Sequence, residues 1–130
     1  MKNSTNHESF ILRPSTVEGG GIGVFAVHDI QKDTRLELFT NDFEEELRDK
    51  EEVPAALQGY CLDHESGKLQ CPKYFNRMDI GNYLNHSQKA NTRWDGTTYY
   101  STRDIQEGEE IFSNYKELGE PEHLRDSYIN

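Results

Sequence analysis

The chain has 130 residues, of which 33% are hydrophobic, and it carries a formal net charge of -10 with a mean hydropathy of -0.93. This length suits one domain with a buried core, and no segment is apolar and long enough to cross a membrane. The acidic charge disfavours direct binding to nucleic acid, because phosphate recognition needs a basic face. Two interpretations stay open: attraction for a basic protein or peptide, or an acidic surface that only provides solubility.

The N-terminus and the cysteines indicate the cellular context. The first ten residues, MKNSTNHESF, lack the apolar core of a signal peptide, so we expect an intracellular, soluble protein of the cytoplasm or nucleus. We expect residues 1–7 to be flexible and residues 8–130 to form a single domain. Cys61 and Cys71 form no Cys-x-x-Cys pair, so no metal site is predicted. A disulfide between them would be unusual in a reducing compartment, which favours free thiols.

The first half of the chain predicts short strands and one helix. Alternation predicts strands over residues 10–13, 24–27 and 35–39, and the first of these ends before Pro14. The glycines at 19–23 predict a loop. A helix is predicted over residues 42–57, with Asp42 as N-cap, an acidic first turn, and Phe43 and Leu47 on one face.

The second half predicts turns and short strands. Residues 59–63 and 68–71 flank His64-Glu65-Ser66-Gly67, a pattern that predicts a hairpin. Residues 79–84 could form a helical turn. Strands are predicted over residues 97–102, after the Asp95-Gly96 turn, and at Ile111-Phe112, after Gly108. Many short strands and little helix indicate a mostly β fold.

Three motifs carry the functional signal. The first, Gly21-Ile22-Gly23-Val24-Phe25-Ala26, fits a dinucleotide-binding fingerprint, but no amphipathic helix follows it, so a Rossmann fold is rejected. The second is Asn85-His86-Ser87, followed by Asn91. Adjacent residues of an extended segment point to opposite sides, which makes a Ser/His nucleophilic pair a poor interpretation. The third runs from Gly108 to Tyr115, GEEIFSNY.

In order and spacing, these motifs resemble the SET domain, the fold of protein lysine methyltransferases that use S-adenosylmethionine. The resemblance covers roughly residues 10–115 and implies several small β-sheets, short helices and a knot-like C-terminal segment. Two positions of the family's Asn-His-Ser-Cys-x-Pro-Asn run differ, with Gln88 for cysteine and Ala90 for proline. In many members that cysteine binds zinc together with a C-terminal cysteine cluster. The chain has neither, so it resembles a minimal, stand-alone SET domain without cysteine-rich flanks.

The resemblance also implies roles for individual residues. Tyr115 and Tyr60 correspond to tyrosines of the methyl-transfer centre and lysine channel and are the expected catalytic residues. The channel would be lined by Tyr60, Tyr83, Ser113 and Tyr115. Cofactor binding is expected from Gly21, Ile22, Gly23, Val24, Asn82, Tyr83, Asn85 and His86.

Three of the matched positions depart from the family's pattern. Asn82 stands where many members have an arginine that can pair with the cofactor carboxylate, and Asn114 stands in place of an aspartate. Ser113 replaces a bulky aromatic residue, which predicts a roomier channel and more than one methyl transfer. The exception would be a channel in which Tyr83, Tyr99 or Tyr100 fills the gap.

The implied function is methyl transfer from S-adenosylmethionine to a lysine of a basic protein, such as a histone. The alternative is a catalytically silent SET-like module that binds a protein partner. The sequence names neither the substrate nor the oligomeric state.

Overall fold

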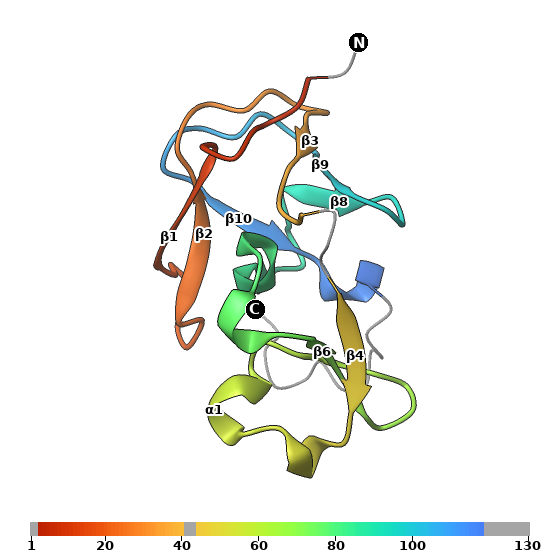
Figure 1. Cartoon of the computed structure of the whole chain (residues 1–130). Coiled ribbons are helices and arrows are strands. Elements are labelled where there is room, and N and C mark those ends of the chain that lie inside the picture. Colours follow the sequence, from red (N-terminus) through yellow and green to blue (C-terminus); the bar gives the residue numbers. More distant parts are fainter. Residues whose placement is uncertain (1–2, 41–43, 119–130) are drawn as a thin grey trace.

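The computed structural model describes residues 3–40 and 44–118 (Figure 1). Its strands are β1 (Phe10–Pro14), β2 (Ile22–Ala26), β3 (Arg35–Leu36), β4 (Glu45–Arg48), β5 (Leu62–Asp63), β6 (Leu69–Pro72), β7 (Asn85–His86), β8 (Thr92–Trp94), β9 (Tyr99–Ser101) and β10 (Glu110–Ser113). The helical elements are the short helix α1 (Ala55–Gln58) and the 3-10 turns η1 (Lys50–Glu52), η2 (Phe75–Arg77), η3 (Ile80–Tyr83) and η4 (Tyr115–Leu118).

The described residues form three small sheets, with strand orders β1-β2-β10-β7, β3-β9-β8 and β4-β6-β5. Strand β10 is the central connection, because it pairs antiparallel with β2 and parallel with β7. Segments that are far apart in the sequence therefore lie side by side in one sheet (Figure 1). This pairing brings the glycine loop, the Asn85-His86 segment and the end of β10 together. The mostly β prediction is confirmed, while the threading of a C-terminal knot stays a prediction.

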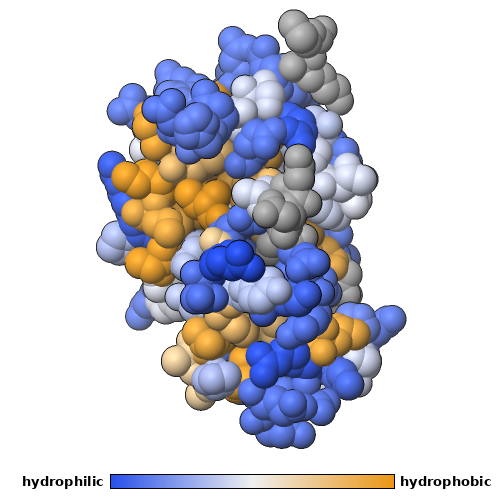
Figure 2. Space-filling view, viewed as in Figure 1, coloured by the Kyte–Doolittle hydropathy of each residue, from blue (hydrophilic) through white to orange (hydrophobic). Residues whose placement is uncertain are grey.

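In the part of the chain that the structure describes, two separate hydrophobic clusters support these sheets. The main core joins the first two sheets and contains Val24, Ala26, Ile30, Leu36, Leu38, Leu84, Tyr99, Ile105 and Ile111. A much smaller core lies within the β4-β6-β5 sheet and contains Val53, Leu69 and Cys71. Some apolar side chains are exposed instead, and those on and just after β1 and β2 are Ile11, Leu12, Ile22 and Val27. Figure 2 shows the corresponding apolar region on the side that holds these strands.

The helix predicted over residues 42–57 is wrong. Glu45–Arg48 form strand β4, and α1 is limited to Ala55–Gln58. The predicted N-cap Asp42 and its neighbour Phe43 lie outside the described residues. A helix here would need a buried apolar stripe, yet Leu47 is 46% exposed.

Strand β6 supplies the physical reason for this difference. Gln70 Nε2 donates to Glu45 Oε1 at 2.9 Å, and Lys73 Nζ lies 3.3 Å from Glu44 Oε2. The acidic run thus gains cross-strand partners as well as backbone pairing, neither of which a short isolated helix would provide. Tertiary pairing outweighs the local helix preference.

The other predicted elements are confirmed with shifted boundaries. The first strand extends through Pro14, the strand at 35–39 shortens to Arg35–Leu36, and the predicted helical turn at 79–84 is η3. Strands β7 and β8 were not predicted. Residues 3–5 run beside Arg35, whose backbone bonds to Asn3 and Thr5, and flexibility over residues 1–7 stays a prediction. In the described part of the chain, no helix is both long and apolar enough to cross a membrane.

Candidate functional site

A cleft of about 1410 Å³ lies where the glycine loop, η3, β7 and the end of β10 meet the segment before β5. Nine of the eleven predicted site residues line it: Gly21, Ile22, Tyr60, Asn82, Tyr83, Asn85, His86, Ser113 and Tyr115. The other two lie behind its wall. Val24 has 0% exposure and belongs to the main core, and Gly23 packs beneath the loop. The fold therefore gathers most residues of all three motifs around one concave surface.

Tyr115 is fixed by hydrogen bonds at both its side-chain hydroxyl and its backbone N–H. Its hydroxyl donates to the backbone oxygen of Leu84 at 2.6 Å, and its backbone N–H donates to Nδ1 of His86 at 3.1 Å. The Tyr115 and His86 rings also lie against each other, with centroids 5.2 Å apart. Because Nδ1 accepts this bond, the neutral imidazole of His86 carries its proton on Nε2. The parallel pairing of β7 with β10 thus fixes the position of the tyrosine ring.

Tyr60 and Tyr83 form a second aromatic contact across the cleft wall. Their ring centroids lie 5.4 Å apart at an interplanar angle of 72°, an edge-to-face arrangement. Tyr60 follows α1, whereas Tyr83 ends η3. The contact therefore joins the β4-β6-β5 region to the motif segment that leads into β7.

Asn82 and Asn114 have local structural roles. Asn82 Oδ1 accepts from the backbone N–H of Asp79 at 3.0 Å, which stabilises the start of η3. Asn114 Oδ1 accepts from the backbone N–H of Lys116 at 3.1 Å at the start of η4. Both asparagines stand where the resemblance implies charged residues, and both satisfy backbone donors at the beginning of a 3-10 turn.

The glycine loop is tied to β7 through Asn85. The Asn85 amide donates to the backbone oxygen of Ile22 and to Oε2 of Glu110, each at 3.2 Å. Gly21 has a φ of +62°, which an L side chain rarely adopts. This conformation turns the loop so that Gly21 and Ile22 form part of the cleft wall.

Ser113 lies beside Tyr99, whose hydroxyl oxygen is 3.1 Å from Ser113 Oγ. Both residues are buried, and burial raises the pKa of Tyr99 to about 12 although the Ser113 hydrogen bond lowers it. Tyr99 also packs against the rings of Phe39 and Trp94. One of the three tyrosines named as alternatives thus lies at this position, so a roomy channel does not follow from the small size of Ser113 alone.

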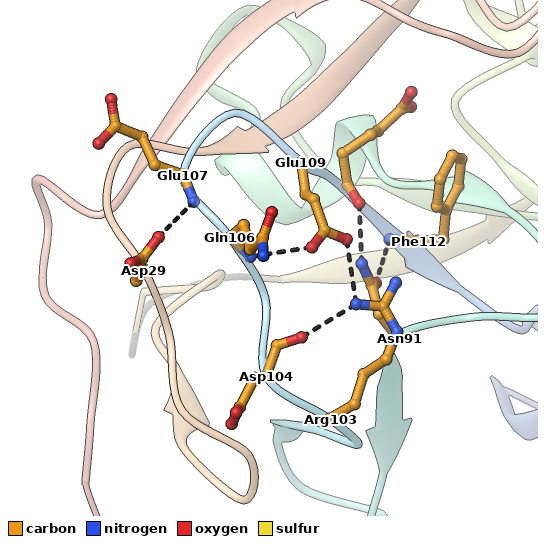
Figure 3. A network of polar contacts seen from close by, with 9 residues as sticks. Asp29, Asn91, Arg103, Asp104, Gln106, Glu107, Glu109 and Phe112 are labelled. Atoms are coloured by element: carbon orange, nitrogen blue, oxygen red, sulfur yellow. Dashed lines mark hydrogen bonds and ion pairs between the residues drawn. The ribbon is translucent and has the colours of Figure 1, made fainter.

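Two residues of the motifs have roles that the sequence analysis missed. Asn91 is 1% exposed, donates to the backbone oxygen of Glu110 at 2.8 Å and accepts from the backbone N–H of Phe112 at 2.9 Å (Figure 3). It therefore satisfies backbone groups of β10 in the manner of a neighbouring strand. Glu110 is buried under the glycine loop. The apolar Ile111 next to Glu110 indicated burial there, but the hydrogen-bond partners of both residues are non-local.

Charged residues around the cleft are mostly acidic. Glu18, Glu37, Glu45 and Asp63 line it, against Arg35 and Lys50 as basic residues. Arg35 pairs with Glu37, and Lys50 Nζ lies 3.7 Å from Asp63 Oδ1. Within residues 3–40 and 44–118, no group of three or more His, Cys, Asp or Glu side chains is arranged to hold a metal ion. The cleft thus offers aromatic walls and a surplus of negative charge near them.

Comparison with known proteins identifies the family. The SET domain profile matches residues 21–116, and the chain therefore belongs to the SET domain family. No curated protein sequence matches the chain.

Solved structures share its fold. One is a Plasmodium falciparum protein, provisionally assigned as a histone methyltransferase, with a TM-score of 0.51 and 22% identity over 85% of this chain and 95% of that chain. Another is Polycomb Repressive Complex 2 of Chaetomium thermophilum bound to S-adenosylmethionine, with a TM-score of 0.58 and 21% identity. That match covers 82% of this chain and 15% of the other, so this chain spans a small part of that protein's length.

Proposed function

We propose that the protein transfers a methyl group from S-adenosylmethionine to a lysine side chain of a basic protein such as a histone. The observation that carries this proposal is the convergence of the three SET motifs on one cleft. The cleft volume of about 1410 Å³ exceeds that of a typical single-ligand site, roughly 300–1,000 Å³. A cofactor and a lysine side chain could therefore occupy it together.

The residues of the cleft fit the cofactor. At Gly21, an added Cβ would meet no atom within 4 Å, so the loop presents bare backbone to open space. Gly21, Ile22, Tyr83, Asn85 and His86 would hold the cofactor, with Asn82 beside them and Gly23 and Val24 supporting the loop from behind. When bound, S-adenosylmethionine supplies a methyl group attached to a good leaving group, the sulfonium.

The tyrosines of the chain would prepare the acceptor amine. A free lysine has a pKa of about 10.4, and it must lose its proton to attack. Aromatic walls formed by Tyr60, Tyr83 and Tyr115 disfavour the charged ammonium and so lower that pKa. Because the Tyr115 hydrogen is committed to Leu84, the Tyr115 oxygen is left as an acceptor. It can accept an amine N–H and so orient the nitrogen lone pair toward the methyl group.

The charge around the cleft supports a basic substrate. Acidic side chains at the cleft attract a lysine-rich segment, and the overall charge of -10 acts in the same sense at longer range. A histone tail has this chemistry, as do other basic proteins. Raised salt is expected to weaken substrate binding more than cofactor binding, because exposed charges are screened.

Two measurements test the proposal. Calorimetry with S-adenosylmethionine should give a Kd of about micromolar order, and incubation with labelled cofactor and histones or a basic lysate should label protein. Cofactor binding without methyl transfer to any protein would overturn the proposed enzymatic activity. Absence of cofactor binding even at about millimolar concentration would favour a silent module that binds a partner.

A further inference from the structure

The side chain of Glu110 is buried between the glycine loop and β7. It is 5% exposed, and its Oε2 accepts from Ser15 Oγ at 2.7 Å and from Asn85 Nδ2 at 3.2 Å. Its Oε1 accepts from the backbone N–H of Thr16 at 2.7 Å and from Thr16 Oγ1 at 2.6 Å. Four donors from two distant segments thus meet at one carboxyl group.

These four bonds use the acceptor capacity of a carboxylate fully. A carboxylate offers about four lone-pair sites, and bonds to it are shorter and stronger than bonds between neutral groups. Ser15 and Thr16 precede the glycines, whereas Asn85 belongs to β7. Glu110 therefore fixes the entry to the glycine loop relative to the strand that contributes the second motif.

The same carboxyl group explains why position 23 is a glycine. A Cβ at Gly23 would overlap Glu110 Oε2, and one at Gly20 would lie 2.9 Å from Ser15 Oγ. Gly23 and Glu110 do not line the cleft, while Gly21 and Ile22 do. The loop is thus supported from beneath by Glu110, and its upper surface is left for a ligand.

We propose that Glu110 is a positioning residue for the cofactor: it holds the glycine loop and Asn85 in the arrangement that binds S-adenosylmethionine without touching it. This inference rests on the proposed function for the identity of the ligand. The effect of Glu110 on the loop itself does not depend on that function and can be measured in the free protein.

Glu109 provides a matched control in the adjacent position. Its carboxyl group faces away from the loop, accepting from the backbone N–H of Gln106 at 2.9 Å and lying 3.0 Å from Arg103 Nη1 (Figure 3). Glu109→Gln and Glu110→Gln therefore remove the same charge from neighbouring residues of one motif. Glu110→Gln alone places an amide N–H₂ against the donors from Thr16 or Asn85.

The first experiment measures amide hydrogen exchange in the cofactor-free protein. Exchange over residues 16–22 should rise about tenfold in Glu110→Gln and stay at the wild-type rate in Glu109→Gln. A uniform rise across all strands would reveal a general structural role and overturn the proposal. Equal exchange in both variants would overturn it as well.

The second experiment measures binding by calorimetry. The Kd for S-adenosylmethionine should rise about tenfold in Glu110→Gln, whereas kcat at saturating cofactor and the KM for a lysine peptide should stay within about threefold. An unchanged Kd would overturn the positioning role. If the wild type bound no cofactor, the proposed function would fail, and the exchange measurement would still decide whether Glu110 fixes the loop.

A second pair of variants covers a failure of Glu110→Gln to fold. Ser15→Ala and Thr16→Val each remove one hydroxyl donor from the loop side of the network, and Thr16 is exposed, so the core stays intact. Each should raise loop exchange and the cofactor Kd in the same direction as Glu110→Gln, by about threefold. Wild-type values in both variants would overturn the proposal.

Discussion

The sheet β1-β2-β10-β7 and the sheet β4-β6-β5 form opposite parts of the cleft, and they are built differently. The first joins strands that are far apart in the sequence and rests on the main core, which contains nine buried residues among those described. The second is a nearly continuous segment from residue 45 to residue 72, and three of the described residues are buried in its core. The first bears Tyr115 just after β10, and the second bears Tyr60 just before β5.

Under the proposed function, this difference would separate two tasks of the cleft. Dense non-local packing and the Glu110 network give the first sheet a fixed geometry, which suits alignment of a cofactor and a reacting methyl group. A small core buries less apolar surface, so the second sheet should open locally at a lower free energy than the whole protein. Such a wall suits the admission of a substrate side chain.

The largest expected effect comes from shortening one side chain in each core. Ile111→Ala removes a fully buried side chain of β10 and should lower the free energy of unfolding by about 4 kcal/mol. Leu69→Ala, in the small core, should cost about 2 kcal/mol, because fewer buried side chains surround it there than in the main core. Urea unfolding measures both.

Hydrogen exchange then shows where each variant acts. Leu69→Ala should raise exchange within β4, β5 and β6 and leave β2 and β10 protected, whereas Ile111→Ala should affect every strand. Equal and global effects of the two variants would contradict two separately stabilised regions.

The second prediction compares the two tyrosines. Tyr115→Phe removes the hydroxyl that bonds Leu84 and should lower kcat by about 100-fold while the Kd for cofactor and the melting temperature change little. Tyr60→Ala removes the ring that contacts Tyr83 and lines the wall, so it should mainly raise the KM for peptide and lower kcat by about tenfold. Turnover of Tyr115→Phe within a few-fold of wild type would remove its assigned role.

In the first sheet, strands β1, β2 and β10 could be predicted from sequence and β7 was missed, whereas in the second sheet the β5-β6 hairpin was predicted and β4 was wrongly assigned to a helix. The motifs of the first sheet have fixed spacing, and the apolar residues around Val24 and Ile111 indicate buried strands. The acidic run at 44–46 has no such signal. Its local composition favours the start of a helix, and only the partners from β6 reveal the strand.

Within the site, the motif residues could be predicted but not their supports. The sequence analysis expected Gly23 to bind the cofactor, whereas the group that lies against Gly23 is the carboxyl of Glu110, 87 residues later in the chain. The contact of Tyr99 with Ser113 depends on how β9 packs against β10, which no local pattern specifies. The periodicity and composition of a sequence do not reveal which side chains form long-range hydrogen bonds with each other.

The third prediction tests the main core through alkaline pH. An unfolded tyrosine ionises near pH 10, whereas burial raises the pKa of Tyr99 to about 12. Between these values the unfolded chain has lost a proton that the folded protein retains, so stability falls as pH rises. The wild type should lose about 2 kcal/mol from this group by pH 12.

Tyr99→Phe isolates that contribution. The variant keeps the ring contacts with Phe39 and Trp94 but has no group to ionise at this position. Urea unfolding at several pH values from 8 upward should show the wild-type and variant curves converging as the pH rises. Parallel curves would show that Tyr99 ionises in the folded protein as it does in the unfolded chain.

The smallest effect on activity is expected for Cys61, which is partly buried and packs against the small core. Cys61 and Cys71 are free thiols, and the pairing of Leu62 with Gln70 places them directly opposite each other in the hairpin. Burial, with the neighbouring Cys71 thiol, raises the pKa of Cys61 well above its usual range.

Since the thiolate is the reactive form of a cysteine, alkylation of Cys61 by iodoacetamide at pH 8 should be at least about tenfold slower in the folded protein than in urea. Alkylation should also proceed through local opening of the β4-β6-β5 sheet, so Leu69→Ala should speed the reaction more than Tyr99→Phe does. The Cys61→Ser variant should keep kcat within about twofold of the wild type. Alkylation as fast in the folded protein as in urea would show that this wall of the cleft is open. It would contradict the proposed difference in local opening between the two sheets.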